Sequence, residues 1–486
     1  MNSINSKSPN IVFITCDQLR ADVLGCYGSH QAKTPNIDAL AARGTVFDNA
    51  YVSSPVCAPN RASWATGQYP SAHGLSTNGI ALDTASQTFM ECLRRSGYQT
   101  AVAGKLHFKP QWSHARGDPS FATDVVSGKG ADDPQPRPWD FPYYGFEQCA
   151  LTEDHNAGSY ASYLEANNYD PWQDPHSASY PQHVTQRSHV PVEHSKTNWI
   201  TDRSIEFVDG FDHDRPFMLW TSYVHPHHPF VVPAPYDEMF KADQMDLPAW
   251  DEAAIEKWPE AYRAKYFAEG TGHEAIGMHK LADEDFLKIR AFYYGMVAHI
   301  DKQIGRLIHQ LNTMPSDRET IIVFSSDHGE MLGDQHLLFK ATHYRCVTRV
   351  PLVITLANQK GKRCNSLTSA VDIMPTILEM AGVASPSGLQ GQSILRCVTN
   401  SDHTLREGVY VENPDCIRSY ITDKARLSWH GPSAQGELYR FENDPHELRN
   451  LWGASDAAML KHEMMESLLN ALVTEAPIPQ RRVAYF

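Results

Sequence analysis

Apolar runs of strand length alternate with helical patterns along most of the chain, and this alternation limits the possible folds more than any other feature. The runs include NIVFITC at 10–16 and TIIVFSSD at 320–327. They are apolar at nearly every position, which is typical of strands buried on both faces. Between them lie TPNIDALAARG, with Thr34 as predicted N-cap and Pro35 at the first helical position, and an amphipathic pattern near 283–312. We therefore predict an α/β fold with a large, mainly parallel, doubly wound sheet.

Two regions depart from this rhythm. Residues 110–200 are rich in Pro, Trp, Tyr, His and Asp, and we interpret them as long ordered loops over one end of the sheet. After DIMPTILEMAGV at 372–383 the pattern changes to short strands and a final helix. A chain of 486 residues is too long for one compact domain. We predict a large α/β domain over residues 1–395 and a smaller C-terminal α+β domain over residues 396–486.

The charge balance and the cysteines limit the partners and the compartment. A formal net charge of −15 disfavours nucleic acid and anionic membranes as main partners. The N-terminal residues lack the apolar core of a signal peptide, and no run is long enough to span a membrane. Nine cysteines without a CxxC pair suit reduced thiols. We expect a cytoplasmic location, unless a leader has been removed.

Ionisable side chains follow four of the predicted strands, at the point where each strand ends. These residues are Asp17, Lys105, His107, His227, Asp327 and His328. Each of them alone would be more simply explained as a helix cap or a satisfied polar residue. The carboxyl ends of parallel strands meet at one edge of a sheet, however, where ligands bind. Their recurrence at this edge therefore predicts one shared site.

The chemistry of these side chains suits a metal and an anion. Asp17, Asp327 and His328 offer oxygen and imidazole ligands for a divalent cation such as calcium, magnesium or manganese. The cationic donors that an anionic substrate needs are Lys105, His107, His227, Arg61 and Lys340. Lys340 has the weakest support, because a surface lysine is its ordinary alternative.

The stretch SSPVCAPNRASWATG at 53–67 places Cys57 between two prolines and near Arg61 at a predicted helix start. CAPNRASWATG resembles the cysteine-type sulfatase signature C-x-P-x-R with its trailing T-G. The motifs GKLH, PHHP, SSDHGEMLGDQHLLFK, RVPLVI, VDIMPTILEMAGV and ELYRFENDPHELRNL follow in that family's order. From about residue 10 to 452 the chain thus resembles the type I, formylglycine-dependent sulfatases of the alkaline phosphatase superfamily, which implies an alkaline phosphatase-like fold.

The resemblance also implies how the site works. A maturase that recognises C-x-P-x-R in an extended chain would oxidise Cys57 to formylglycine, whose hydrate is the nucleophile. The helix start beside it would favour a bound anion. Asp17, Cys57, Asp327 and His328 would bind the metal, for which calcium is the first expectation.

The remaining positions carry over in the same way. Arg61 would support the hydrate, and Lys105 and Lys340 would hold sulfate oxygens. The other residues implied are His227 as the acid for the leaving alcohol, His107 as the group that helps to deprotonate the second hydroxyl, and Asn78 as part of the pocket lining.

Three positions depart from the common sulfatase pattern. Cys16 precedes Asp17 where many sulfatases have a pair of aspartates, and His328 stands where many have Asn. Choline sulfatases and phosphonate monoester hydrolases resemble the chain here. Cys16 fits strand packing better than metal binding. Arg345 lies close to the place of a family Glu, so the pocket chemistry there is expected to differ.

Four functions remain open on these grounds. We expect hydrolysis of a small anionic sulfated substrate, a saccharide first because aromatic loops suit sugar faces. An aryl or alkyl (choline-like) sulfate comes next. A phosphonate monoester or phosphodiester hydrolase is the third, although such relatives tend to lack the Lys105 and His107 pair. A catalytically inactive binder with unconverted Cys57 is the most remote, and the oligomeric state is left open.

Overall fold

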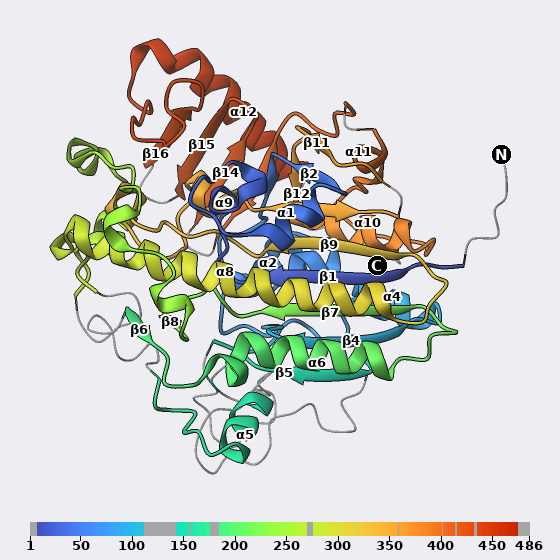
Figure 1. Ribbon diagram of the computed structural model, residues 1–486. Coiled ribbons are helices and arrows are strands. Elements are labelled where there is room, and N and C mark those ends of the chain that lie inside the picture. The colour runs from blue at the N-terminus through green and yellow to red at the C-terminus, as the bar shows by residue number, and fades with distance from the viewer. Residues whose placement is uncertain are drawn as a thin grey trace, which may run out of the picture.

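An eight-stranded sheet lies at the centre of the larger part of the molecule (Figure 1). The computed structural model describes residues 7–110, 142–154, 156, 158–174, 184–269, 276–357, 359–400, 402–413, 416–431 and 435–474. The strand order is β11-β2-β10-β9-β1-β7-β4-β5. The strands are β1 (Asn10–Cys16), β2 (Thr45–Phe47), β4 (Gln99–Gly104), β5 (Gln148–Leu151), β7 (Phe217–Tyr223), β9 (Thr320–Ser326), β10 (Leu352–Thr355) and β11 (Lys362–Cys364).

Most of this sheet is parallel. Strands β9, β1, β7, β4 and β5 all run in one direction, and β1 pairs with β7 on one side and β9 on the other. Strand β10 is antiparallel to both β9 and β2. Two pairs of short strands form separate small sheets, β3 (Ala50–Tyr51) with β12 (Thr368–Ser369) and β6 (Thr185–Arg187) with β8 (Phe230–Val232).

Helices cover both faces of the sheet. On one face α1 (Pro35–Ala41), α6 (Lys196–Gly210) and α8 (Asp283–Thr313) share a core with Val12 and Ile14 of β1. On the other face α2 (Cys57–Thr66), α4 (Phe89–Arg95) and α10 (Ile373–Met380) pack with Ile11 and Phe13. Successive side chains of β1 therefore enter opposite cores, as a strand buried on both faces requires. This confirms the predicted doubly wound α/β architecture.

The prediction of loops throughout 110–200 was wrong for part of that range. Residues 111–141 and 175–183 lie outside the described residues. Among the others, β5 adds a parallel strand to the sheet edge, and α5 (Ser159–Ala166), β6 and the first turn of α6 follow. The aromatic and polar composition concealed β5, because only two of its four residues are buried.

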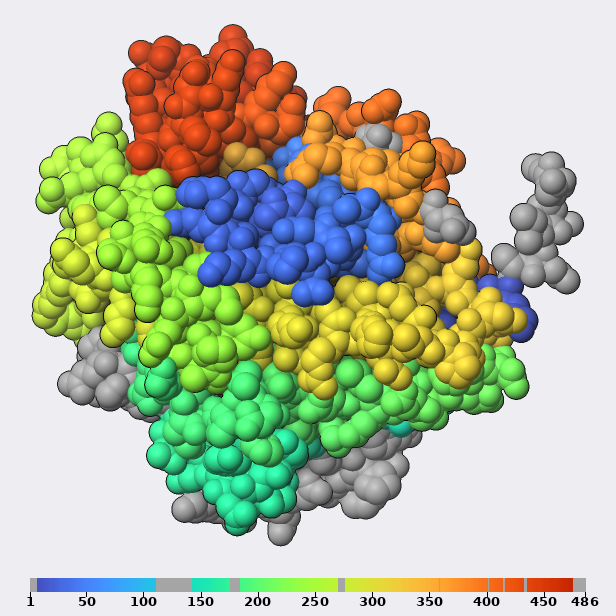
Figure 2. Space-filling view, in the orientation of Figure 1, coloured from blue at the N-terminus to red at the C-terminus, as the bar shows by residue number. Residues whose placement is uncertain are grey.

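The C-terminal part forms a separate, smaller sheet. Strands β13 (Val409–Glu412), β14 (Ile417–Ile421), β15 (Ala425–His430) and β16 (Gln435–Arg440) are antiparallel in sequence order, and α12 (Ala458–Thr474) packs on them. Figure 2 shows this red segment as a lobe above the rest. The predicted α+β character is confirmed. The predicted boundary at 395/396 falls inside α11 (Leu395–Thr399) and stays a prediction.

The remaining α-helices of the described residues are short. They are α3 (Pro70–His73), α7 (Glu260–Phe267) and α9 (Arg345–Thr348). Among the described residues, no helix combines the length and the apolar character needed to cross a membrane.

Candidate active site

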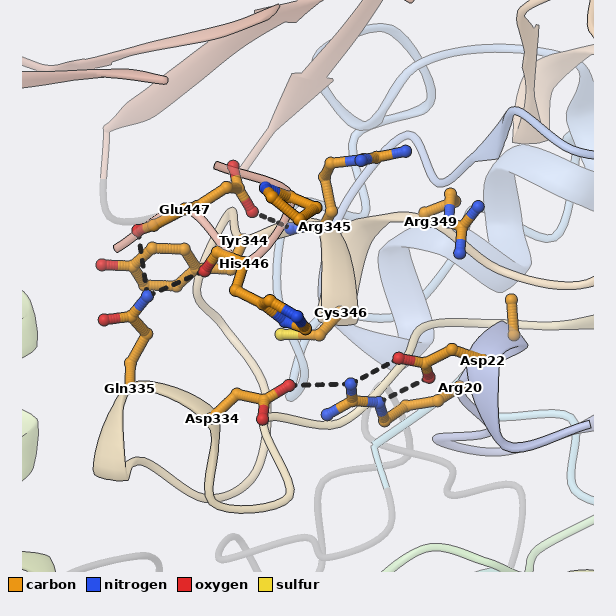
Figure 3. A pocket seen from close by; sticks show the side chains of 12 residues that line it. Arg20, Asp22, Asp334, Gln335, Tyr344, Arg345, Cys346, Arg349, His446 and Glu447 are labelled. Atoms are coloured by element: carbon orange, nitrogen blue, oxygen red, sulfur yellow. Dashed lines mark hydrogen bonds and ion pairs between the residues drawn. The ribbon is translucent and has the colours of Figure 1, made fainter. Parts of the chain in front are cut away.

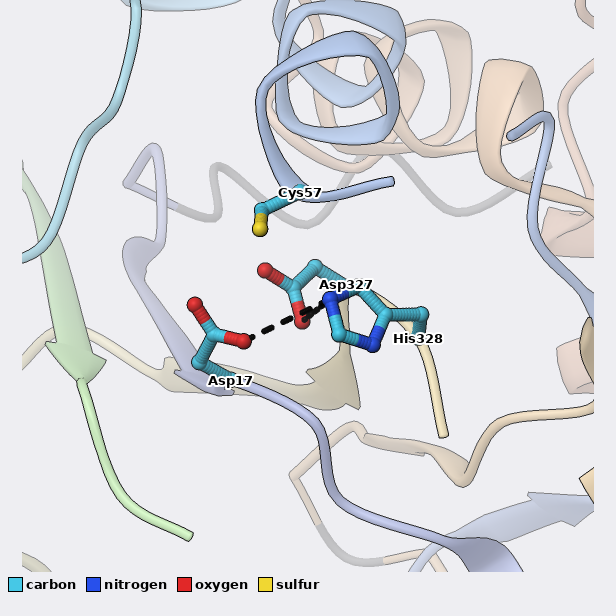
Figure 4. A group of neighbouring side chains, drawn as sticks. All are labelled: Asp17, Cys57, Asp327 and His328. Carbon is cyan, nitrogen blue, oxygen red and sulfur yellow. Dashed lines mark ion pairs between the residues drawn. The ribbon is translucent and has the colours of Figure 1, made fainter. Parts of the chain in front are cut away.

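The carboxyl ends of β1, β4, β7 and β9 bring the predicted residues to one place. The side-chain atoms of Asp17, Cys57, Asp327 and His328 that could bind a metal all lie within 4.8 Å of one another. Figure 4 shows them facing a common point, below the first turn of α2. All four residues are buried. Asp17, Asp327 and His328 therefore lie together at one edge of the sheet, as the strand-end rule predicted.

His328 and Asp17 are oriented as metal ligands would be. The His328 Nδ1–H donates to the carbonyl oxygen of Gly329 at 2.8 Å, so that Nε2 presents a lone pair. This nitrogen lies 3.5 Å from Asp17 Oδ1. Neither atom has a hydrogen-bond partner within the described ranges. A cation between these two facing buried groups would satisfy both, and the donor set fits a divalent ion.

Cys57 is the first residue of α2 and is fully buried. Lys340 Nζ lies 3.0 Å from its sulfur, and Asn78 Nδ2 lies 3.8 Å from it. Burial acts to raise the pKa of the Cys57 thiol, but the charges of Lys340 and Lys105, together with hydrogen bonds from His107 and His227, hold it well below its ordinary value. The site thus stabilises negative charge at position 57.

Arg61 lies one turn along the same helix and contacts both carboxylates of the candidate metal site, Asp17 and Asp327. Its Nε donates to Asp327 Oδ2 at 2.7 Å, and its Nη1 donates to the Lys105 carbonyl and to Ser222 Oγ, each at 2.9 Å. Arg61 Nη2 lies 3.7 Å from Asp17 Oδ2. Burial acts against its charge, but Asp327 and Asp17 raise the pKa of Arg61 above its ordinary value. The guanidinium therefore orients both carboxylates.

Lys340 and His227 form a pair beside Cys57. Lys340 Nζ lies 2.7 Å from His227 Nε2, while His227 Nδ1 lies 2.5 Å from the carbonyl oxygen of His228. An ammonium only donates, so Nε2 accepts from Lys340 and Nδ1 carries the ring proton in this state. Burial would lower the pKa of Lys340, but Cys57 and Asp17 raise it.

Lys105 lies between two carboxylates, one of which the sequence did not reveal. Its ammonium is 2.6 Å from Asp17 Oδ2 and also forms an ion pair with Asp154. Asp154 lies three residues beyond β5, so the strand-end rule would have found it had β5 been recognised. Asp17, Asp154 and His227 form a second group with metal-ligand spacing. In this second group the Lys105 ammonium lies between the carboxylates of Asp17 and Asp154 and pairs with both.

His107 has a left-handed backbone conformation with φ 57°, and its backbone N–H donates to Glu153 Oε1 at 2.9 Å. Burial would lower the pKa of His107, but a hydrogen bond with Cys57 and the charge of Glu153 raise it. Glu153 is a second residue that the sequence did not reveal, and it too follows β5.

Two glycines bring the site loops against neighbouring backbone. An added Cβ would lie 1.9 Å from the Ser222 carbonyl oxygen at Gly104, and 1.9 Å from the Cys346 carbonyl oxygen at Gly329. Any larger residue would displace the loop. Cys16, by contrast, packs in the core of the first face, as expected.

Arg345 does not enter this site. It lines a pocket of about 230 Å³ between the large sheet and the C-terminal part, which Figure 3 shows together with Arg20, Arg349 and Glu447. Its guanidinium stacks over Phe441 at 4.1 Å. None of the candidate residues lines this cavity, and the expectation that Arg345 changes the chemistry of the substrate pocket stays a prediction.

The family model for sulfatases matches residues 9–383. The chain belongs to the sulfatase family. It is accordingly a sulfuric ester hydrolase, as the motifs predicted. A second family model, described as the C-terminal part of N-sulphoglucosamine sulphohydrolase, matches residues 333–474.

Relatives and solved structures match this sulfatase over nearly its whole length. An arylsulfatase from Clostridium perfringens is 30% identical over 459 residues, which cover 91% of this chain and 90% of the relative. An N-acetylglucosamine-6-O-sulfatase from Bacteroides thetaiotaomicron is 26% identical, covering 95% of this chain and 86% of the relative. The structure of a phosphonate monoester hydrolase of Agrobacterium radiobacter superposes with a TM-score of 0.81 at 25% identity, covering 96% of each chain.

Proposed function

We propose that this sulfatase hydrolyses the sulfate monoester of a small saccharide, with formylglycine formed from Cys57 and a bound divalent metal, calcium first. The observation that carries the proposal is the surrounding of Cys57. A buried sulfur at a helix start has an ammonium 3.0 Å away and carboxylate and imidazole ligands within 4.8 Å. Such a site favours an oxyanion. The relative named as an N-acetylglucosamine-6-O-sulfatase supports a saccharide substrate.

The residues that would hold the metal are Asp17, residue 57, Asp327 and His328. When bound, the metal supplies Lewis-acid stabilisation of negative charge on oxygen. When formed, formylglycine supplies a hydrate with one hydroxyl to attack sulfur and a second to help release sulfate.

The chain's own residues do the rest. Lys340 and Lys105 hold the sulfate oxygens, since both ammonium groups lie at the site and both are buried. His227, next to Lys340, gives a proton to the alcohol oxygen as its bond to sulfur breaks. For this step a proton must reach Nε2, which accepts a hydrogen bond from Lys340 in the free site. His107 accepts the proton of the second hydroxyl.

A phosphonate monoester hydrolase is the second candidate. The TM-score of 0.81 to such an enzyme favours it. His328 in the candidate metal site also favours it, because phosphonate monoester hydrolases resemble the chain at this position. Lys105 and His107 argue for sulfate, because phosphonate monoester hydrolases resembling this chain tend to lack this pair. An aryl or alkyl sulfate is the alternative within the family, and an inactive binder would keep Cys57 unconverted.

Two measurements test the proposal. Mass spectrometry of the peptide around residue 57, from protein made with a maturase, should find an aldehyde or its hydrate. A panel of sulfated mono- and disaccharides, with an aryl sulfate and an aryl phosphonate for comparison, should give the highest kcat/KM on a saccharide sulfate. Intact cysteine in fully active protein would refute the nucleophile, and a higher kcat/KM on the phosphonate would establish the second candidate.

A further inference from the structure

Asp154 is a third carboxylate in the site, and its position differs from that of Asp17 and Asp327. The side chains of Asp17 and Asp327 are fully buried, whereas 18% of the Asp154 side chain is exposed. Asp154 forms an ion pair with Lys105, and its Oδ1 lies 3.9 Å from His227 Nδ1. It thus approaches both side chains that face the sulfate and the leaving alcohol in the proposed function.

The position of Asp154 is fixed by its surroundings. Lys196 Nζ, at the start of α6, donates to the carbonyl oxygens of Glu153 at 2.7 Å and of Asp154 at 3.1 Å. The Glu153 carboxylate in turn accepts from the backbone of His107. The loop that carries Asp154 is therefore tied to the same elements that form the anion site.

A carboxylate beside the lysine that grips the anion weakens the binding of every anion, in proportion to the charge that the anion carries. A sulfate monoester or a phosphonate monoester carries one negative charge. A phosphate monoester carries two once the pH exceeds about 6. The repulsion by Asp154 is therefore about twice as large for a phosphate monoester, although the three esters have the same tetrahedral shape.

We propose that Asp154 is a specificity-determining residue, which makes the site select singly charged ester anions over doubly charged ones. The inference rests on the proposed function for the position of the anion against Lys105. It concerns the charge of the substrate and not the element at its centre.

The test uses three 4-nitrophenyl esters at pH 8: the sulfate, the phosphate and the phenylphosphonate. In Asp154→Asn, the ratio of kcat/KM for phosphate over sulfate should rise on the order of 10- to 100-fold. The ratio for phenylphosphonate over sulfate should change less than about threefold, because both carry one charge. Asp154→Glu keeps the charge and should keep the wild-type ratios.

Asp174→Asn is the matched control. Asp154, His227 and Asp174 line one small cavity. Asp174 is paired with His189 Nδ1 at 2.6 Å, so its removal should leave the ratios unchanged. An equal fall for all three esters in Asp154→Asn would reduce Asp154 to a structural support of Lys105 and overturn the proposal. A rise for phosphonate as large as that for phosphate would also overturn it.

Binding covers the case in which Asp154→Asn is inactive. Sulfate carries two charges and sulfamate one, and calorimetric dissociation constants need no turnover. Asp154→Asn should tighten sulfate relative to sulfamate on the order of tenfold, and equal changes would contradict the inference. If the wild type hydrolyses the phosphonate but no sulfate ester, the proposed function fails, while the ratio of phosphate to phosphonate still tests Asp154.

Discussion

The active site and the C-terminal sheet each contain a fully buried arginine, Arg61 and Arg426, but the two sites differ in how many of their polar atoms have hydrogen-bond partners. In the C-terminal sheet, Arg426 lies 2.6 Å from Glu447 and 3.3 Å from Glu437, and its guanidinium is 4.8 Å from the Tyr439 ring. All three of its nitrogens donate to side chains. In the active site, Arg61 also pairs with a carboxylate, but Asp17 Oδ1 and His328 Nε2 beside it have no hydrogen-bond partner in the described residues.

The difference separates structural from functional burial of charge. A buried ionic group whose donors and acceptors are all partnered holds the chain together, and removing one partner leaves the other exposed to the full cost of burial. Buried acceptors that face each other without a proton are stable only when something outside the chain completes them. The two regions should therefore respond to mutation in opposite ways, one in stability and the other in turnover.

The largest effect is expected at Cys57. Cys57→Ala should lower kcat by at least about 10⁴-fold, because it removes the residue that becomes the nucleophile. The midpoint of thermal unfolding should change little, since a small side chain is lost from a ligand site. Steady-state kinetics and calorimetry on the same sample check both. Substantial residual turnover in Cys57→Ala would contradict the role of residue 57 as the nucleophile, and with it the contrast between the active site and the C-terminal sheet.

Metal removal should come next. Exhaustive chelation should lower turnover on the order of 10³-fold, and calcium, magnesium or manganese should restore it. Asp327→Ala should weaken metal binding more than His328→Asn, because it removes a charge, whereas the amide oxygen can still bind. Titration of the metal into the stripped protein measures both. Full activity after chelation would mean that Asp17 Oδ1 and His328 Nε2 bind something other than a metal.

Arg426→Met should have the opposite profile. It leaves Glu437 and Glu447 buried without their cation, which should lower the free energy of unfolding by roughly 3–5 kcal/mol. The protein that remains folded should keep its kcat within about threefold, because Arg426 contacts none of the candidate residues. Arg440→Met, at the exposed end of β16, is the control and should cost less than about 0.5 kcal/mol. Urea unfolding and active-site titration separate the two effects.

A smaller, pH-dependent effect is expected at Lys196. Burial lowers the pKa of Lys196 from its ordinary 10.5 to about 7, more than Asp154 raises it. Between these values the unfolded chain binds a proton that the folded chain has lost, so the free energy of unfolding rises with pH relative to Lys196→Met. The slope should reach about 1.4 kcal/mol per pH unit. Below pH 7 both states are protonated and the difference should be constant; urea unfolding at several pH values measures it.

The sequence was informative where a strand is strongly apolar. Strands β1, β7 and β9 are fully or almost fully buried, and each delivers predicted residues such as Asp17, His227 and Asp327 to the site edge. Only two of the four residues of β5 are buried and the strand lies in an aromatic segment, so Asp154 and Glu153 were not found from the sequence. Arg345 shows the converse, because closeness to a motif in sequence did not decide which cavity the side chain lines.

The pairing of β1 with β9 also has a consequence for the order of events during synthesis. β1 is complete at residue 16, but its partner on one side begins at Thr320. Asn60 and Arg61, on the helix that starts at Cys57, both bond Asp327, which follows that late strand. At roughly 5–20 residues per second, the ribosome needs on the order of 10–60 s to synthesise the chain between the end of β1 and the start of β9. Throughout this interval Cys57 lacks its contact with Lys340, and its helix lacks the bonds to Asp327, so an enzyme that requires an extended chain has that long to reach it.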